Sequence, residues 1–336
     1  MKKLLFLVCC IALMGGVSLW AGGQGGEESA EPIVCKIAHS GTEQIPRHIG
    51  FLRFKEIVEE KTDGAIKVEI YPNGQLGTEA QITEQVKLGT IQATITGSFE
   101  QIAPELLIYT MPFLFSEIDG LHKVTRGPIG EKIAANAEDN GYIILATGDA
   151  GLFRHFSNNV RPITKPADMK GLKMRTPPIE TIIKTMEALG ANPVSIPYVE
   201  VYMALKTGVA DGQENPYINI ANMKFHEVQK YLTVVSYQWH PAPFTFSLKW
   251  YNSLSPKFQR IVKAAAVEAM VVNDDYNQQA ADEAYNTIKD SVQINVLTDE
   301  QRQLFIDACA PVYDYYIKQG LFTEEDLEDI RKSAKS

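Results

Sequence analysis

Residues 171–195 read GLKMRTPPIETIIKTMEALGANPVS, and this stretch decides the fold class. Residues 172–175 have the composition of a short strand, and residues 179–189 carry apolar side chains at helical spacing. The same order occurs earlier, since residues 33–38 indicate a strand and residues 49–61 an amphipathic helix. This alternation of strands and helices predicts an α/β fold.

Other segments continue the alternation. Residues 66–70 alternate apolar and charged side chains, as a half-buried strand does, and the turn residues of Tyr71-Pro72-Asn73-Gly74 follow them. Further strands are expected at residues 142–147, 233–236 and 244–249, and further helices at residues 79–88, 127–140, 199–206, 299–308, 311–319 and 323–332.

Two features suggest that the α/β elements form two lobes. Residues 255–290 predict one helix well above the mean length of about 11 to 12 residues, long enough to run along both lobes. The stretch Trp239-His240-Pro241-Ala242-Pro243 holds two prolines, which fix an extended path because proline has no N–H and a restricted φ. We interpret it as a hinge strand between the lobes.

Composition limits the function. The chain has 336 residues, 45% hydrophobic and 22% charged, which describes a globular protein large enough for two domains. Its formal charge of -9 argues against a nucleic-acid partner, because phosphate binding needs a clustered excess of Lys and Arg. An anionic ligand would therefore need a local basic site.

The N-terminus predicts export. Lys2 and Lys3 precede an apolar run and then small residues near Ala21, so residues 1–23 are interpreted as a cleaved signal peptide. The apolar run is shorter than the ~20 residues of a membrane span. Cys35 and Cys309 remain in the mature chain, and two separate buried thiols are favoured over a bridge, which export would also permit.

The motifs of common enzymes are absent from the sequence. It has no GxSxG elbow, no P-loop, no GxGxxG and no CxxC pair, and His226-Glu227 lacks the second His of a zinc helix. Of the six histidines, His39, His155 and His240 lie where strands or the hinge could open into a cleft. No catalytic pair and no metal set emerges from these residues.

Five motifs in order carry a family resemblance. They are residues 71–77 (YPNGQLG), 171–177 (GLKMRTP), 187–191 (EALGA), 197–205 (PYVEVYMAL) and 211–216 (DGQENP). This series resembles the DctP-type solute-binding proteins of TRAP (tripartite ATP-independent periplasmic) transporters, and the resemblance covers nearly the whole chain from Val34.

The resemblance implies a fold, a site and a partner. It implies a two-lobed, type II-like periplasmic binding protein, with lobe I at residues 33–151 plus 240–279 and lobe II at 152–239 plus 280–336. The lobes would close on a carboxylate-bearing ligand, held by Arg175 first, Arg154 second and Asn215 to complete the clamp. Glu79 and Tyr198 would line the pocket. The protein would be a periplasmic monomer that serves the TRAP permease subunits, without cofactor, metal or catalysis.

The chemistry of these side chains agrees with such roles. Arg175 offers a planar fork of donors that matches a carboxylate, and it follows a strand, where α/β sheets place ligands. Tyr198 could equally stack on a ligand or belong to the core. Glu79 suits a ligand with hydroxyl donors, so a sugar acid such as a uronate is favoured, and a C4-dicarboxylate comes next. His39, Trp239 and His240 are candidates to shape the rest of the pocket.

Two other functions stay open at this point. A periplasmic enzyme acting on an organic acid would need a paired acid and base, and a ligand sensor would need a signalling partner. Turnover of the ligand would distinguish the enzyme from a binding protein. A neighbouring pair of genes for a large and a small membrane subunit would favour transport over sensing.

Overall fold

The computed structural model describes residues 31–97 and 99–335. From Pro32 onward the chain forms one compact unit. The predicted signal peptide at residues 1–23 lies outside the described residues. None of the helices within the described residues combines the length and the apolar character that a membrane span requires.

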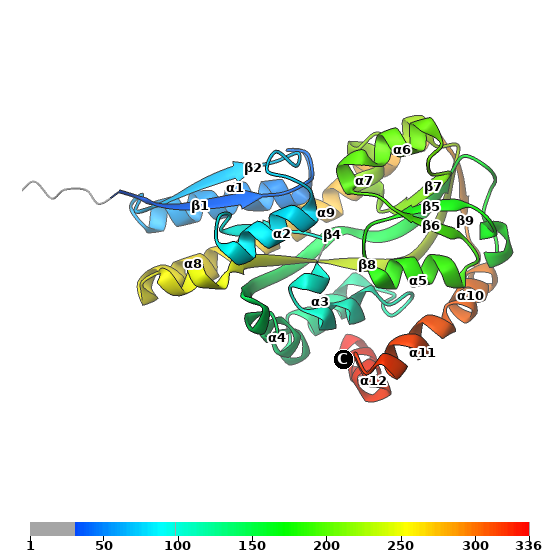
Figure 1. Ribbon diagram of the computed structural model, residues 1–336. Coiled ribbons are helices and arrows are strands. Elements are labelled where there is room, and N and C mark those ends of the chain that lie inside the picture. The colour runs from blue at the N-terminus through cyan, green and yellow to red at the C-terminus, as the bar shows by residue number, and fades with distance from the viewer. Residues whose placement is uncertain (1–30, 98, 336) are drawn as a thin grey trace, which may run out of the picture. The chain divides into compact units, whose positions relative to one another are not determined.

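A nine-stranded mixed sheet runs through this unit (Figure 1). Its order is β2-β1-β3-β8-β4-β7-β5-β6, with β9 also paired to β8. Strands β1, β2 and β3 are parallel to one another at one end, and β5, β6 and β7 at the other, while β4 and β8 join the two ends as an antiparallel pair. The bounds are β1 Ile33–Ala38, β2 Ile66–Tyr71, β3 Ala93–Ile95, β4 Tyr142–Asn158, β5 Lys173–Thr176, β6 Asn192–Ser195, β7 Gly212–Asn215, β8 Tyr231–Ser247 and β9 Gln293–Val296.

Strand β8 contains the segment predicted as a hinge strand. The segments expected at 233–236 and 244–249 and the extended crossing expected at residues 239–243 belong to one strand of 17 residues, except that residues 248 and 249 lie in helix α8 (Leu248–Ser253). Pro241 and Pro243 lie within β8 because β3 pairs only with Phe244, Thr245 and Phe246, so no described strand flanks that side of β8 at the prolines. The partner strand β4 is also 17 residues long, with a register shift between Asp149 and Phe153.

Helices cover both ends of the sheet. Helix α9 is 33 residues long and contacts α1, β4 and α7, which belong to different ends, as expected for the predicted long helix (Figure 1). The helices are α1 Pro46–Lys61, α2 Glu79–Leu88, α3 Ile118–Thr125, α4 Pro128–Ala135, α5 Glu180–Ala188, α6 Val201–Thr207, α7 Tyr217–Asn222, α8 Leu248–Ser253, α9 Pro256–Ile288, α10 Asp299–Ala308, α11 Ala310–Gln319 and α12 Glu324–Lys335. The short 3₁₀ helices are η1 Phe99–Gln101, η2 Pro104–Thr110, η3 Glu138–Asn140, η4 Pro166–Met169, η5 Tyr198–Glu200 and η6 Phe225–Val228.

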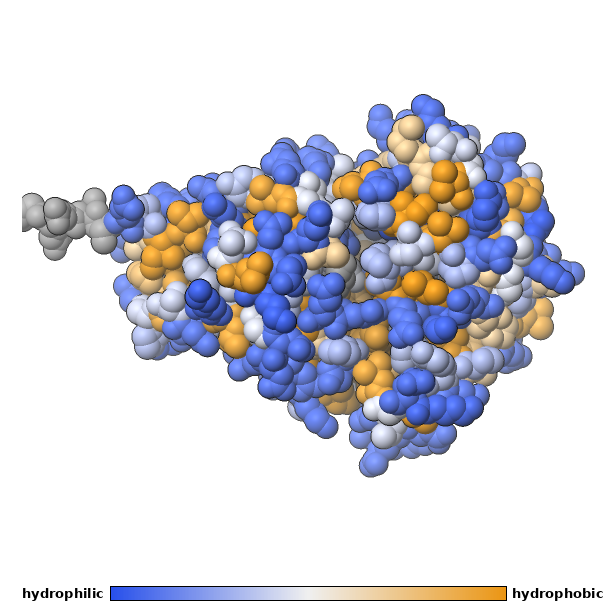
Figure 2. All heavy atoms as spheres, viewed as in Figure 1, coloured by the Kyte–Doolittle hydropathy of each residue, from blue (hydrophilic) through white to orange (hydrophobic). Residues whose placement is uncertain are grey.

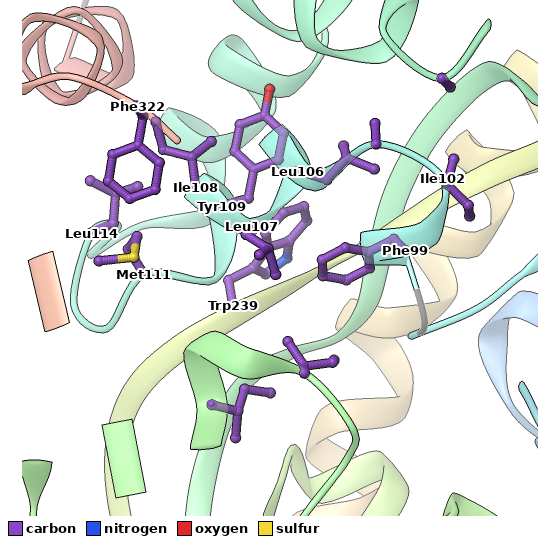
Figure 3. Packing of buried hydrophobic residues seen from close by; sticks show 14 of the residues in the cluster. Phe99, Ile102, Leu106, Leu107, Ile108, Tyr109, Met111, Leu114, Trp239 and Phe322 are labelled. Atoms are coloured by element: carbon purple, nitrogen blue, oxygen red, sulfur yellow. The ribbon is translucent and has the colours of Figure 1, made fainter. Parts of the chain in front are cut away.

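The largest apolar cluster surrounds Trp239 (Figure 3). It combines η1 and η2 with α3 and with Val312, Tyr316 and Ile330 of the C-terminal helices. Of the C-terminal helices, α12 packs on helix α3, which the sequence prediction placed in the other lobe, whereas α11 packs on α5. The predicted lobe boundaries remain a proposal, and the C-terminal helices contribute contacts to both parts.

Cys35 and Cys309, the two cysteines among the described residues, are free thiols, as the sequence favoured. Cys35 lies in the apolar cluster around β1 and α1, and Cys309 lies in the cluster around β5. Burial raises the pKa of the Cys309 thiol to about 12 and that of Cys35 still further. Neither thiol is therefore reactive as a thiolate near neutral pH.

Candidate functional site

A cavity lies where the carboxyl ends of β3, β5 and β7 meet the middle of β4 and β8. This is the place at which open α/β sheets bind ligands. Its lining comes from both predicted lobes: Arg47, Glu79, Ile95, Thr96, Gly97, Ala150, Arg154, Arg175, Pro177, Tyr198, Asn215, Asn219, His240 and Pro241. Arg175, Arg154, Asn215, Glu79 and Tyr198, which the sequence singled out, therefore share one cavity.

Segments of the two predicted lobes touch beside this cavity. A Cβ atom placed on Gly74, in the turn after β2, would lie 3.2 Å from Cγ1 of Val199. Val199 follows the lining residue Tyr198, and with Met203 and Val209 it is among the exposed apolar side chains. On the largely hydrophilic face in Figure 2, apolar residues gather over the α6 and α7 region.

Arg175 is a fully buried cation at the end of β5, with 1% of its surface exposed. Its Nε and Nη2 donate to the carbonyl oxygen of Ile196 at 2.9 and 2.7 Å. Burial lowers the pKa of Arg175 to about 10, so the guanidinium is still charged at neutral pH. The edge that remains, Nη1 with the second hydrogen of Nη2, is a fork that fits a carboxylate.

Arg154 on β4 differs from Arg175, because a buried carboxylate of the protein already compensates its charge. Its Nε lies 2.5 Å from Oε2 of Glu214, and its Nη2 donates to Oε1 at 2.9 Å. Tyr237 also donates to Oε2 of Glu214, at 2.6 Å. Burial lowers and the Glu214 carboxylate raises the pKa of Arg154, and the net direction is upward. Arg154 thus contributes donors to the cavity without an unbalanced charge.

Asn215 is oriented by its neighbours. Its Oδ1 accepts hydrogen bonds from Nη2 of Arg154 at 3.1 Å and from Nδ2 of Asn219 at 2.9 Å, and its Nδ2 donates to Gln213. Because Pro216 follows, the backbone of Asn215 is restricted to extended geometry. The side-chain amide of Asn215 is therefore held in a fixed orientation at the cavity, between the end of β7 and the start of α7.

Glu79 is the first residue of α2, which begins with a capping box between Thr78 and Gln81. Its Oε1 accepts a hydrogen bond from Ser40 at 2.6 Å, and its Oε2 accepts one from the backbone N–H of Gly97 at 3.2 Å. Nη1 of Arg47 lies 3.8 Å from Oε1. The carboxylate therefore has a fixed position in the cavity wall.

Tyr198 and His240 complete the wall. Burial raises the pKa of the Tyr198 hydroxyl, so it remains a neutral group. The His240 ring lies edge-on to Phe99, with 5.1 Å between ring centroids. Burial, with the nearby Arg154, Arg47 and Arg175, lowers the pKa of His240 well below its usual 6.5, so the imidazole is neutral at physiological pH.

His39 and Trp239 lie outside the cavity wall. His39 faces His48, with 3.1 Å between the ring nitrogens, and packs against Phe51. The Trp239 indole donates to Oδ1 of Asp149 at 2.8 Å, within the largest apolar cluster. Trp239 lies outside the cavity because successive side chains of a strand point to opposite faces of the sheet. His240 faces the cavity, so its neighbour Trp239 faces away from it.

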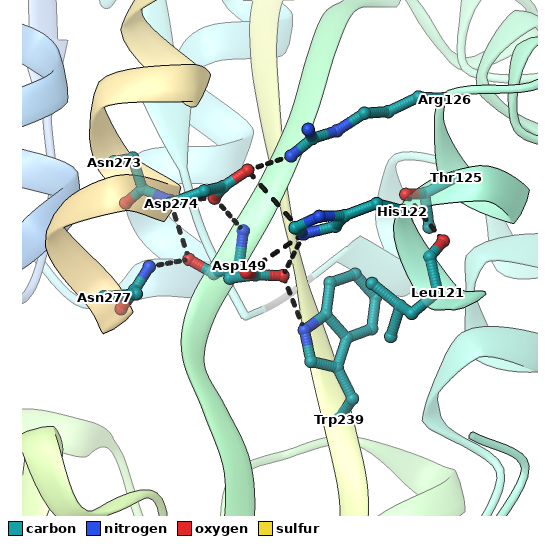
Figure 4. A network of polar contacts seen from close by, with 9 residues as sticks. All are labelled: Leu121, His122, Thr125, Arg126, Asp149, Trp239, Asn273, Asp274 and Asn277. Atoms are coloured by element: carbon teal, nitrogen blue, oxygen red, sulfur yellow. Dashed lines mark hydrogen bonds and ion pairs between the residues drawn. The ribbon is translucent and has the colours of Figure 1, made fainter. Parts of the chain in front are cut away.

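Asp149 is the centre of a polar network between β4, α3 and α9 (Figure 4). The ligand atoms of His122, Asp149 and Asp274 lie within 4.8 Å of one another, a spacing that could hold a metal ion. Each of the four carboxylate oxygens already accepts a hydrogen bond, and the cation of Arg126 pairs with Asp274. We therefore interpret the cluster as a structural network that links β4, α3 and α9.

The cavity includes residues that sequence reasoning did not select. Arg47 comes from the first turn of α1, and Asn219 from α7. Glu214, the buried partner of Arg154, stood inside a quoted motif without a role. Sequence reasoning could have selected Glu214 as a charged residue within the DGQENP motif, and Asn219 as an amide three residues after it. Nothing in the sequence marked Arg47.

This fold and cavity define a class: an α/β binding protein in which two sets of segments enclose a ligand site. Residues 37–319 match the family described as "Bacterial extracellular solute-binding protein, family 7". The chain belongs to this family, of the DctP type.

Three relatives illustrate the similarity. The C4-dicarboxylate-binding periplasmic protein DctP of Rhodobacter capsulatus is 33% identical, over 85% of this chain and 86% of that protein. The 2,3-diketo-L-gulonate-binding periplasmic protein YiaO of Escherichia coli is 32% identical, over 81% and 83%. The crystal structure of the sugar acid binding protein DctPAm from Advenella mimigardefordensis, in complex with galactonate, superposes with a TM-score of 0.86 at 27% identity, covering 90% of this chain and 98% of that one.

Proposed function

We propose that this protein binds a small organic acid through a carboxylate at Arg175 and delivers it to the membrane subunits of a TRAP transporter. One observation carries the proposal. Arg175 is buried in the wall of the cavity, its pKa of about 10 keeps it charged, and no described carboxylate pairs with it. An anionic ligand would compensate this buried charge, which is otherwise costly.

The relatives support an organic acid. Their names give a C4-dicarboxylate, a diketo sugar acid and an aldonate as ligands. The Glu79 carboxylate in the same cavity favours a ligand with hydroxyl donors, so a sugar acid such as a uronate comes first and a C4-dicarboxylate second.

Processing, assembly and turnover belong to the same proposal. The protein would act in the periplasm as a monomer after removal of the signal peptide near Ala21, and it would release its ligand chemically unchanged. The intact mass of the exported protein tests the cleavage. Analysis of the ligand after long incubation with stoichiometric protein tests for turnover.

A thermal-shift panel on protein that has been stripped of ligand by refolding tests the function. A ligand that binds only the native state stabilises it by ~2.7 kcal/mol at a hundredfold excess over Kd. We expect uronates, aldonates or C4-dicarboxylates to raise the unfolding midpoint, and neutral sugars of equal size to leave it unchanged. A midpoint that rises with neutral sugars or amines and with no acid contradicts the proposal.

A further inference from the structure

Glu79, Arg47, Gly97 and His240 form a second polar part of the cavity, here called the Glu79 cluster. A Cβ atom placed on Gly97 would lie 2.9 Å from Oε2 of Glu79 and 3.6 Å from Nε2 of His240. The carboxylate and the imidazole therefore border the same small space. A ligand that fills the cavity from Arg175 meets this cluster with its remaining groups.

His240 needs a partner that both donates and accepts. Both of its ring nitrogens are buried, and neither forms a hydrogen bond with any described residue. A neutral imidazole has one N–H donor and one acceptor nitrogen. Buried polar groups are almost always paired in native proteins, so such a ring in a cavity wall indicates a polar ligand group. A hydroxyl satisfies either nitrogen, whereas a carboxylate can only accept.

Charges in the cavity point the same way. Arg154 is paired with Glu214, and Arg47 lies 3.8 Å from Glu79. Arg175 is then the one guanidinium of the cavity wall that lacks a carboxylate among the described residues. One ligand carboxylate compensates it. A second would face Glu79 and a neutral imidazole, and like charges at close range repel.

We propose that the Glu79 cluster selects acids with a single carboxylate and a hydroxyl at the far end over acids with a carboxylate at both ends, and that Glu79 and His240 make this selection. The inference rests on the proposed function, because it takes the first carboxylate to lie at Arg175. It narrows the substrate class to monocarboxylates that carry hydroxyl groups.

Calorimetry with matched pairs of acids tests the selection. In each pair the terminal hydroxymethyl or aldehyde carbon of one acid is a carboxylate in the other: erythronate and meso-tartrate, galactonate or galacturonate and galactarate, gluconate or glucuronate and glucarate. We expect at least one monocarboxylate to bind at least about tenfold more tightly than its dicarboxylate partner, a difference of ~1.4 kcal/mol.

Two sets of variants assign the selection to residues. Glu79→Gln removes one negative charge at similar shape and should lower the mono-to-dicarboxylate ratio by at least about fivefold. His240→Leu should weaken the monocarboxylate by at least about tenfold and its partner less, while His240→Gln, which keeps a donor and an acceptor, should weaken the monocarboxylate less than His240→Leu does. A merely structural role of His240 would change both acids equally.

The possible outcomes distinguish a failure of the proposed selection from a failure of the proposed organic-acid binding. If every dicarboxylate binds as tightly as its monocarboxylate partner, or if the ratio is unchanged in both Glu79→Gln and His240→Leu, the selection is refuted while the binding of an organic acid stands. If no acid of either class binds the folded protein, the proposed function fails and the inference fails with it.

Discussion

The guanidinium of Arg154 and the carboxylate of Glu214 form an ion pair inside the protein, with 2.5 Å between Nε and Oε2. The side chains are 5% and 0% exposed. Arg175, also buried, donates to the carbonyl oxygen of Ile196 and forms no ion pair with a carboxylate of the described residues. We therefore expect the two arginines to differ in role, with Arg154 stabilising and orienting the site and Arg175 supplying the charge for a ligand.

The first prediction concerns the stability of this pair. Glu214→Gln leaves the Arg154 cation buried and unpaired, which typically costs about 3 to 5 kcal/mol. Urea unfolding of ligand-free protein should show a loss of that order in the free energy of unfolding. The control is Lys332→Gln, which removes an exposed pair with Glu328 and should cost less than about 1 kcal/mol. Equal losses in the two variants would contradict a structural role for the buried pair.

The second prediction concerns pH. Burial first, and then the neighbouring Asp149, raise the pKa of Asp274 from 3.8 to about 6. Between these values the folded protein binds more protons at Asp274 than the unfolded chain does, so the free energy of unfolding should fall as the pH rises from about 4 to 6. The contribution is of order 2 kcal/mol, since one pKa unit corresponds to ~1.4 kcal/mol.

Asp274→Asn isolates this contribution, because the amide oxygen can still accept from the backbone N–H of Asp149. Denaturant curves at several pH values should show the parent losing stability relative to the variant as the pH rises through this window. Parallel pH profiles of parent and variant would show that Asp274 does not titrate in this way.

The third prediction concerns Gly97. A Cβ atom there would lie 2.9 Å from Oε2 of Glu79, so Gly97→Ala should displace the carboxylate and weaken ligand binding by roughly five- to tenfold, about 1 kcal/mol or slightly more. The unfolding midpoint should change little. In a double-mutant cycle, adding Gly97→Ala to Glu79→Ala should cost little more, because the colliding group is absent. Additive losses would show that Gly97 acts independently of Glu79.

The fourth prediction concerns motion. The cavity wall comes from both predicted lobes, and the Gly74 turn reaches Val199 beside it. We expect the lobes to open without ligand about β4, β8 and α9, and to close on binding, because a buried clamp must admit its ligand. Small-angle scattering should show a smaller radius of gyration at saturation. Identical curves with and without a tight ligand would count against closure.

The sequence predicted most of the fold because its local signals are strong. Glu79–Leu88 was expected as a helix on its apolar periodicity, and the capping box at Thr78 fixes its start. The extended path through Pro241 and Pro243 was expected from the restricted φ of proline, and the open edge beyond β3 makes both residues compatible with a strand. The full length of β8 depends on its pairing with β4, which local patterns do not encode. The packing of α12 on α3 also depends on long-range contacts, which local patterns do not encode.

The site was predictable where motifs cluster and unpredictable where tertiary structure gathers distant residues. Arg175, Asn215, Tyr198 and Glu79 lie in or next to recognisable motifs, Arg154 was expected from the family resemblance, and all five line the cavity. The choice between Trp239 and His240 depended on strand register, which sequence does not give. Arg47 reaches the cavity only because α1 packs beside β3, and no residue near it in sequence marks this.

The affinity of Arg175→Lys for the tightest acid tests the central claim most directly. Lysine keeps the positive charge but has no planar fork, so it cannot donate to Ile196 and present two parallel hydrogen bonds to a carboxylate. Losing a charge-assisted hydrogen bond costs ~1.5 to 3 kcal/mol. Calorimetry should therefore show binding weaker by at least about tenfold, and Arg175→Ala weaker still, with circular dichroism unchanged in both. If Arg175→Lys stays folded and binds within about twofold of the parent, bidentate recognition of a carboxylate by Arg175 is wrong.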